Sequence, residues 1–200
     1  IAQIAIDNGI NTIIDFFSDE VAQEISEQYQ KFDVVIARHM FAHNEDPADL
    51  LAAMSLILSD DGIFLIENAY ALDTFQNGEF DQIYHEHMFY FSALNISALM
   101  QKFDFELLDF SHSPVHGGSG VFICGKKGKH TPNASVQDTL DDEKTAFQEK
   151  KIFHSFKAKI ESNKIQAIKL IQDEIKQGHI VGAYGAPAKA FTVFSYYELD

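Results

Sequence analysis

The sequence predicts an α/β fold built on a largely parallel sheet. Continuous apolar segments at residues 32–40 and 63–67 indicate buried strands, because a strand covered on both faces lacks polar alternation. Segments with helical character separate these strands, and a helix that crosses between two strands makes them parallel. With 46% hydrophobic residues in 200, the chain can build a substantial core. Helices on both faces of a sheet are therefore expected.

The first elements follow from local signals. Residues 11–17 are β-branched and apolar, as in a strand. Ser18 can cap a helix over residues 19–30, whose acidic first turn suits the helix dipole. Residues 44–47 (Asn-Glu-Asp-Pro) form a turn that leads into a helix over residues 48–58. A strand–helix–strand–helix–strand order results.

After residue 80 the pattern changes. Ser92 or Asn95 starts a helix that ends near Lys102, and residues 106–110 and 120–124 indicate two further strands. The connection between these strands is rich in glycine, which favours a loop and an antiparallel edge to the sheet.

The last third divides into a linker and a second unit. Residues 126–142 are polar, and residues 144–177 show a helical stripe with a break expected near residues 161–163. Residues 178–186 indicate a strand entering a glycine turn, and Pro187 or Ala188 starts another helix. The predicted division is 1–126 for the first domain, 127–143 for the linker, and 144–200 for a helical segment and the start of a second domain.

Composition limits the possible partners. Thirty acidic against 15 basic residues give a formal charge of -15, which repels nucleic acid, although a local helix N-terminus can still bind a small anion. The sequence has no apolar run of the roughly 18 residues that a membrane span needs. One cysteine, Cys124, excludes an intrachain disulfide and a cysteine-built zinc site, so we expect a reducing cytoplasm.

The strongest functional signal is the run Tyr-His-Glu-His at residues 84–87. All four side chains can move or share a proton, and apolar neighbours on both sides indicate a partly dry site. Such surroundings shift pKa values, as catalytic sites require. The alternative is a hydrogen-bonded surface turn that is rich in histidine.

Two further readings of histidine and carboxylate groups stay open. A zinc-protease motif would need a histidine at position 89, which is Phe89, yet a metal-dependent hydrolase using His85, Glu86 and His87 remains an alternative. His39 and His43 lie at the carboxyl end of a predicted strand, the edge where open α/β sheets bind their ligands.

The glycine turn at residues 182–186 matches neither the dinucleotide fingerprint nor the phosphate-loop motif. A strand–glycine–helix junction nevertheless offers free backbone N–H groups to an anion, and Lys189 adds a positive charge. We expect Lys189 to bind substrate. Close packing of the helix on its strand is the alternative.

Five sequence blocks, taken in their order along the chain, are similar to the signature blocks of one enzyme family. The most specific of them is the Y-x-E-H-x-x-x-F-S pattern that begins at Tyr84. Together they resemble the S-adenosylmethionine-dependent sugar-nucleotide C-methyltransferases, a family that builds branched deoxysugars, over essentially the whole chain. The blocks are IIDFFS (13–18), FDVVIARHMFAH (32–43), FDQIYHEHMFYFS (80–92), PVHGGSG (114–120) and GAYGAPAKAFTV (182–193).

The resemblance implies a class I methyltransferase (Rossmann-like) sheet that is truncated at its N-terminus. A helical linker and the start of a second α/β domain would follow. The glycine-rich donor loop, the acidic residue that holds the ribose, and the family's N-terminal zinc-binding region are not found in the sequence. We therefore expect an internal fragment that is inactive by itself and binds S-adenosylmethionine weakly.

The resemblance also implies roles for individual residues. His87 would be the general base, Tyr84 its phenolic partner, Glu86 a supporting carboxylate, and His43 a histidine on the substrate side. The donor pocket would contain Phe16, Ala37 and Arg38. His116 and Gly117 would face the sugar nucleotide, although Val121 stands where the family often has an arginine.

The expected activity is methyl transfer to a carbon next to the keto group of a nucleotide-linked deoxysugar, without a metal. A histidine with a pKa near neutrality suits removal of the proton beside a carbonyl. An O- or N-methyltransferase on the same fold and a non-catalytic sugar-nucleotide binding module are the alternatives. The expected partner is a small sugar nucleotide, and neither nucleic acid nor a membrane.

Overall fold

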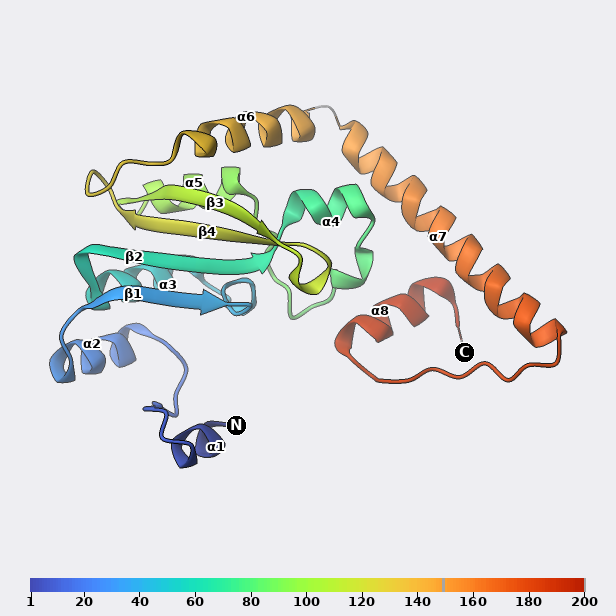
Figure 1. The fold of residues 1–200 in the computed structure, drawn as a ribbon, viewed down its shortest axis with the longest axis horizontal. Helices are drawn as coiled ribbons and strands as arrows, with labels where there is room; N and C mark the ends of the chain where they lie inside the picture. The colour runs from blue at the N-terminus through green and yellow to red at the C-terminus, as the bar shows by residue number, and fades with distance from the viewer. Residues whose placement is uncertain (149, 200) are drawn as a thin grey trace.

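The computed structural model describes residues 1–148 and 150–199, and its centre is a four-stranded mixed sheet in the order β1-β2-β4-β3 (Figure 1). β1 and β2 are parallel, whereas β4 runs antiparallel to both of its neighbours. The predicted α/β class and the antiparallel edge are thereby confirmed, but the described sheet is mixed rather than largely parallel, because two of its three strand pairs are antiparallel. The strands are β1 (Phe32–Arg38), β2 (Leu58–Ala69), β3 (Phe105–Ser113) and β4 (Ser119–Lys126).

Helices α2 (Asp19–Gln28), α3 (Pro47–Ile57) and α5 (Ala93–Gln101) begin where the sequence signals predict. The Ser18 hydroxyl accepts a hydrogen bond from the Val21 N–H, which confirms Ser18 as the cap of α2. Ser92 forms a capping box at the start of α5, so the first of the two predicted start positions is correct. These helices and the sheet bury one continuous apolar core.

Short elements gather at the carboxyl ends of β1 and β2. They are the 3-10 turns η1 (Phe41–His43), η2 (Phe80–Gln82) and η3 (Val115–Gly117), together with helix α4 (Ala71–Asn77). Such short turns hold side chains close to the sheet edge, where ligands bind in open α/β folds.

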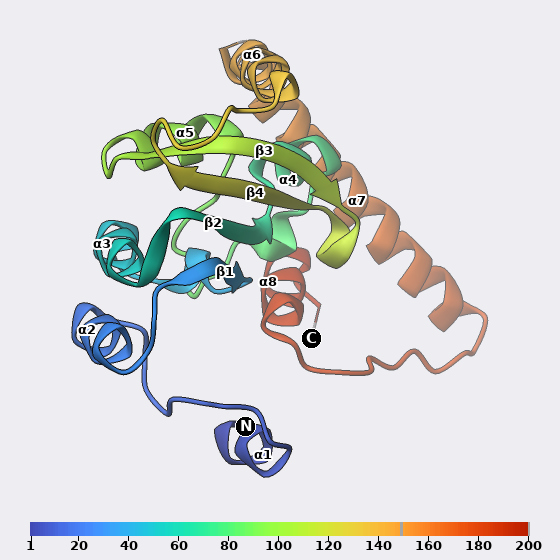
Figure 2. The same ribbon diagram turned by 60° about the vertical axis from the view of Figure 1, so that its left-hand side comes forward.

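The C-terminal third is helical and returns to this edge (Figures 1 and 2). α6 (Ala134–Gln148) packs on β3 and α5, α7 (Lys151–Lys176) leads away from the sheet, and α8 (Ala188–Tyr197) comes back to pack on η2. The ring of Phe80 contacts the rings of Tyr196 and Tyr197, in a small apolar cluster with Ile160. This cluster fixes α8 beside the segment that carries residues 84–87.

Two predicted strands are wrong. Residues 11–17 and 178–186 have strand-like sequences but no strand conformation in the structure. Neither segment is hydrogen-bonded into the sheet, and a strand needs a neighbouring strand to satisfy its backbone groups. The Ile180 side chain is 100% exposed, so this apolar residue is not buried as in a covered strand.

The predicted helix break is also wrong, because residues 161–163 lie inside α7, whereas α6 ends at Gln148 and α7 begins at Lys151. Residues 134–143 of the polar segment interpreted as a linker belong to α6. The reason is a buried polar residue: Glu143 is fully buried on α6 and hydrogen-bonds to Tyr70 and to the start of α5. The division of the chain into domains stays a prediction.

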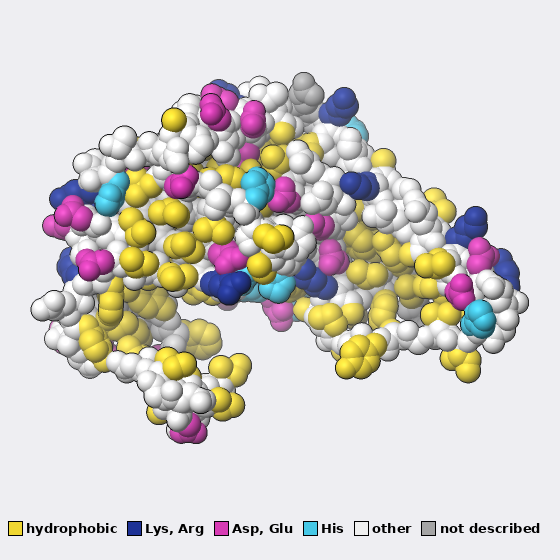
Figure 3. Space-filling view, in the orientation of Figure 1, with side chains coloured by type: hydrophobic (Ala, Val, Ile, Leu, Met, Phe, Trp, Pro, Cys, Tyr) yellow, Lys and Arg dark blue, Asp and Glu magenta, His cyan; other side chains and the backbone are white. Residues whose placement is uncertain are grey.

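Apolar side chains remain exposed at both ends of the chain. α1 (Ala2–Asp7) lies apart from the sheet in Figures 1 and 2, and no residue of this helix is buried. Figure 3 shows hydrophobic side chains in the hollow between α7 and α8, which Ile171, Ile175, Val181 and Phe194 help to line. None of the described helices combines the length and the apolar character that crossing a membrane requires.

Candidate active site

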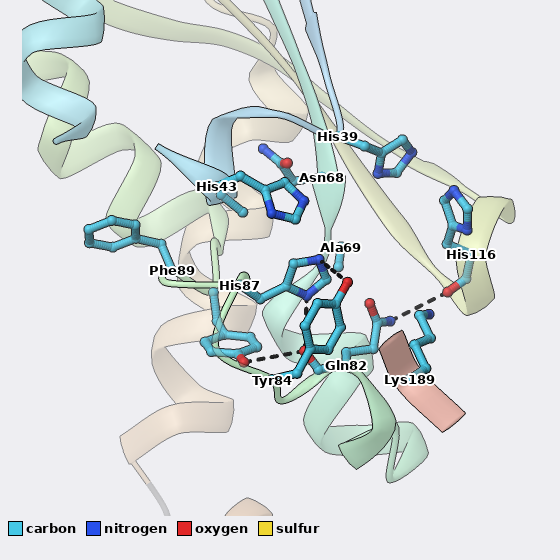
Figure 4. A pocket seen from close by; sticks show the side chains of 12 residues that line it. His39, His43, Asn68, Ala69, Gln82, Tyr84, His87, Phe89, His116 and Lys189 are labelled. Atoms are coloured by element: carbon cyan, nitrogen blue, oxygen red, sulfur yellow. Dashed lines mark hydrogen bonds between the residues drawn. The ribbon is translucent and has the colours of Figure 1, made fainter. Parts of the chain in front are cut away.

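A cavity of about 180 Å³ opens beside the carboxyl ends of β1 and β2 (Figure 4). Ligand pockets commonly reach roughly 300 Å³ or more, so this one fits the reacting part of a ligand rather than a whole nucleotide. Histidines, amides and phenols from five segments meet there. Its lining residues are His39, Ala42, His43, Asn68, Ala69, Gln82, Tyr84, His87, Phe89, Tyr90, His116 and Lys189.

His87 is held at both ring nitrogens. Its Nδ1 atom lies 2.9 Å from the backbone carbonyl oxygen of Gln82, and its Nε2 atom lies 2.9 Å from the Tyr84 hydroxyl. A carbonyl oxygen only accepts, so Nδ1 carries the proton and donates it. In the neutral ring Nε2 is then an acceptor, and the Tyr84 hydroxyl donates to it. The arrangement leaves a basic nitrogen beside the cavity.

Burial keeps these groups neutral. Desolvation lowers the pKa of His87, and the nearby His43 and Lys189 lower it further, against the opposing effects of the Gln82 carbonyl and Glu86. Desolvation also raises the pKa of the Tyr84 phenol, with Glu86 and Asp81 adding to the effect. At neutral pH the pair is therefore an unprotonated imidazole and a protonated phenol. That state is the one required of a base with a hydrogen-bonding partner.

His43 lies next to His87, with 4.8 Å between the ring centroids. Its Nδ1 atom is 2.8 Å from the backbone carbonyl oxygen of Glu86, so Nδ1 donates and Nε2 is an acceptor in the neutral ring. The sequence-predicted residues Tyr84, His87 and His43 thus meet in one cavity. The Glu86 side chain does not line it, because only its backbone carbonyl takes part in this contact.

The surroundings of His85 give the metal-hydrolase alternative no support. The His85 side chain is 92% exposed, and its Nε2 atom lies 4.0 Å from the Glu86 carboxylate. Neither side chain lines the cavity. Over residues 1–148 and 150–199, no group of three or more histidine, cysteine, aspartate or glutamate side chains is arranged to hold a metal.

The glycine-rich loop after β3 reaches the cavity through His116. The rings of His116 and His39 meet edge to face at 4.6 Å, and both residues have positive φ angles, 56° and 49°. Left-handed backbone at non-glycine residues is uncommon and concentrates at functional sites. Gly117 has φ 92° and does not line the cavity. It lies near Glu79, since a Cβ atom added to Gly117 would be 3.2 Å from the Glu79 carboxylate.

Lys189 enters the cavity from the first turn of α8. Its Nζ atom is 4.0 Å from the Asp81 carboxylate, too far for a hydrogen bond. Figure 4 shows Lys189 beside Gln82 and His116. A cation at this position can receive an anionic group of a ligand.

The lining amides Asn68 and Gln82 were not among the expected site residues, whereas His39 was expected at this sheet edge without an assigned role. Asn68 and His39 each have a buried side-chain nitrogen, Nδ2 and Nε2, without a hydrogen-bond partner among the described residues. Gln82 donates its amide to Glu79 and to the carbonyl of His116. A polar residue directly after the apolar run 63–67 was the available signal for Asn68. Gln82 lies within the recognised block 80–92.

The residues expected to bind the methyl donor differ in their surroundings. Ala37 is buried at the end of β1, the Nε atom of Arg38 lies 2.7 Å from the Glu67 carboxylate, and the Phe16 ring is 91% exposed. A free aromatic face and a guanidinium at a strand end suit an adenosyl group and a carboxylate. The chemistry of Phe16 and Arg38 thus fits the methyl donor. The described residues do not enclose a cavity around these two side chains.

An α/β fold with hydrogen-bonded histidines and a phenol in a cavity at the carboxyl edge of its sheet is compatible with many reactions. Comparison with known proteins identifies the family. Residues 2–109 match the family model described as a methyltransferase domain, and residues 114–200 match the model described as a C-methyltransferase C-terminal domain. The chain belongs to the methyltransferase family. S-adenosylmethionine is the cofactor of these enzymes.

Individual relatives agree with this assignment. The chain is 31% identical over 191 residues to C-methyltransferase NovU from Streptomyces niveus; the match covers 94% of this chain and 46% of the relative. The chain thus spans about half the length of this curated relative.

Among the solved structures that are similar to this chain is a SAM-dependent methyltransferase from Anabaena variabilis ATCC 29413. It has 14% sequence identity and a TM-score of 0.45, and the match covers 59% of this chain and 58% of that chain. Magnesium protoporphyrin IX methyltransferase from Synechocystis PCC 6803, with bound SAH, has 10% identity, TM-score 0.38 and coverage of 52% and 48%.

Proposed function

We propose that the protein transfers a methyl group to the carbon next to the keto group of a nucleotide-linked deoxysugar. The observation that carries the proposal is the neutral His87–Tyr84 pair, hydrogen-bonded through Nε2 inside a cavity at the sheet edge. Methylation of carbon needs a base, because the carbon becomes nucleophilic only after losing a proton. The relationship to a C-methyltransferase supports the choice of carbon over oxygen or nitrogen.

The chemistry of this chain would begin at Nε2 of His87. The C–H bond beside the carbonyl breaks, its proton moves to Nε2 through the Tyr84–His87 pair, and its electrons form the C=C bond of an enolate. Nδ1 keeps its proton on the Gln82 carbonyl, so the imidazolium that forms is stabilised by a backbone acceptor. Phe89 and Tyr90 would exclude water from the enolate.

The donor would lie against Phe16, Ala37 and Arg38, and it supplies an electrophilic methyl group on a positively charged sulfur. His116 and Lys189 would bind the sugar nucleotide, with the Lys189 cation directed at the diphosphate. Glu86 would act through its backbone carbonyl on His43. A role in deoxysugar biosynthesis in the cytoplasm accompanies this proposal, in agreement with the free, buried Cys124.

The test is the position of the transferred methyl group. The whole protein is incubated with ¹³C-methyl-labelled S-adenosylmethionine and a 4-keto deoxysugar nucleotide, and the product is examined by NMR. A new carbon–carbon bond beside the carbonyl supports the proposal. A methyl group on oxygen or nitrogen favours the alternative methyltransferases, and binding without transfer favours a non-catalytic module.

A further inference from the structure

Removal of a proton beside a carbonyl leaves negative charge on the oxygen, so the site needs a hydrogen-bond donor for that oxygen. Four donors in the cavity are already engaged, and His116 and Lys189 are proposed to bind the nucleotide. The Tyr84 hydroxyl donates to Nε2 of His87, and Nδ1 of His43 donates to the Glu86 carbonyl. Tyr90 donates its hydroxyl to the Gln82 carbonyl, and Gln82 donates its own amide to Glu79 and to the His116 carbonyl.

Asn68 is the amide that remains. Its side chain is 2% exposed and lines the cavity, and its Nδ2 atom has no hydrogen-bond partner among the described residues. Buried amides are almost always hydrogen-bonded, so a free one facing a cavity indicates a partner that binds there. In Figure 4 Asn68 lies beside His43, whose ring is next to that of His87.

The position of Asn68 also suits a fixed donor. It lies on β2, the strand between β1 and β4, opposite Gly120 in the β2–β4 ladder. A donor on a central strand moves little during a reaction, and preorganised donors stabilise charge most effectively. His39 is a weaker candidate, because its Nε2 atom is 3.7 Å from the Glu67 carboxylate, which can accept a hydrogen bond from it after a small movement.

We propose that Asn68 is a catalytic residue that donates a hydrogen bond from Nδ2 to the keto oxygen of the sugar and to the enolate oxygen that replaces it. The inference rests on the proposed function. As His87 takes the proton, the carbonyl π electrons move onto the oxygen, and the Asn68 N–H group stabilises the charge there. No further reactant is needed. Because the enolate binds Asn68 more strongly than the ketone does, the effect falls on the chemical step.

The test measures deuterium exchange at the carbon beside the carbonyl, in D₂O, with thymidine diphosphate 4-keto-6-deoxyglucose as probe. Asn68→Ala should slow exchange about 100-fold, the usual scale for one lost oxyanion donor, and change probe affinity less than about threefold. Asn68→Asp keeps the shape without the amide donor and should lose at least as much. Thermal unfolding shows whether each variant is folded. If Asn68→Ala is not folded, Asn68→Asp alone provides the test.

Thr74→Val is the matched control. Thr74 is also buried with an unpartnered side-chain atom, Oγ1, but it does not line the cavity. Its exchange rate should equal that of the wild type. Exchange at the wild-type rate in both Asn68 variants would overturn the role of Asn68. All variants are made in the whole protein, and no exchange in the whole wild-type protein would instead refute the proposed function, on which that role depends.

Discussion

The Nδ1 atom of His87 lies 2.9 Å from the backbone carbonyl oxygen of Gln82, and this contact determines which nitrogen of the ring can accept a proton. The amide of the same glutamine donates to the carbonyl of His116. One buried residue thus connects the His87 ring to the loop expected to face the sugar. The orientation of the base and the position of that loop depend on each other through Gln82.

The pH dependence of catalysis should report the lowered pKa of His87. Only the neutral ring can act as a base, so kcat/KM should rise with pH and reach its plateau once His87 is deprotonated. Because burial lowers the pKa of His87, the midpoint should lie below the ordinary histidine value of about 6.5.

Lys189→Met should move this midpoint upward, since the Lys189 charge contributes to the lowering. A pH–rate profile of both proteins measures the effect. An unchanged midpoint in Lys189→Met, or a wild-type midpoint well above 6.5, would show that another group controls the profile.

Lys189 should also contribute to substrate binding. Lys189→Ala is expected to raise KM for the sugar nucleotide about tenfold, because a cation directed at a diphosphate is lost, while donor affinity stays unchanged. Lys164→Ala is the matched control, since Lys164 pairs with Glu198 and does not line the cavity. If both variants behave alike, Lys189 has no specific contact with the nucleotide.

Glu143 should matter for stability. Its carboxylate accepts hydrogen bonds from the Tyr70 hydroxyl at 2.6 Å and from the N–H groups of Ala93 and Leu94 at 2.7 and 2.8 Å. Glu143→Ala leaves these buried donors unpaired, so the free energy of unfolding should fall by about 3 kcal/mol.

Urea unfolding checks this value. Asp142→Ala, at the exposed neighbouring position, should change the free energy of unfolding by less than about 0.5 kcal/mol. Equal stability of the two variants would mean that α6 is not held to α5 through Glu143.

Much of the fold could be predicted because its signals are local. Ser18 and Ser92 cap the helices that they were expected to cap, and the apolar runs at 32–40 and 63–67 lie within or around strands β1 and β2. The strands expected at 11–17 and 178–186 failed because a strand depends on a distant partner, which local sequence does not reveal. Residues 134–143 of α6 were interpreted as linker because the polar Glu143 is buried by contacts that are remote in sequence.

The part of the site that lies in the sequence block 80–92 could be predicted. Tyr84 and His87 are three residues apart and meet directly, and His43 joins them at the expected sheet edge. Asn68 could not be identified, because a single asparagine after a strand is common and its importance lies in the lack of a partner, which only the structure reveals. The sequence also did not indicate that the Glu86 side chain lies outside the cavity.

The central claim is that His87 removes a proton from the carbon that receives the methyl group. The most direct measurement uses a 4-keto sugar nucleotide deuterated at that carbon and follows deuterium loss together with methyl transfer, in the wild-type protein and in His87→Ala. The wild type should lose deuterium with each transfer. His87→Ala should bind the donor normally and slow both events about 100-fold or more. Near-normal turnover in His87→Ala, or methylated product that keeps its deuterium, would contradict the account.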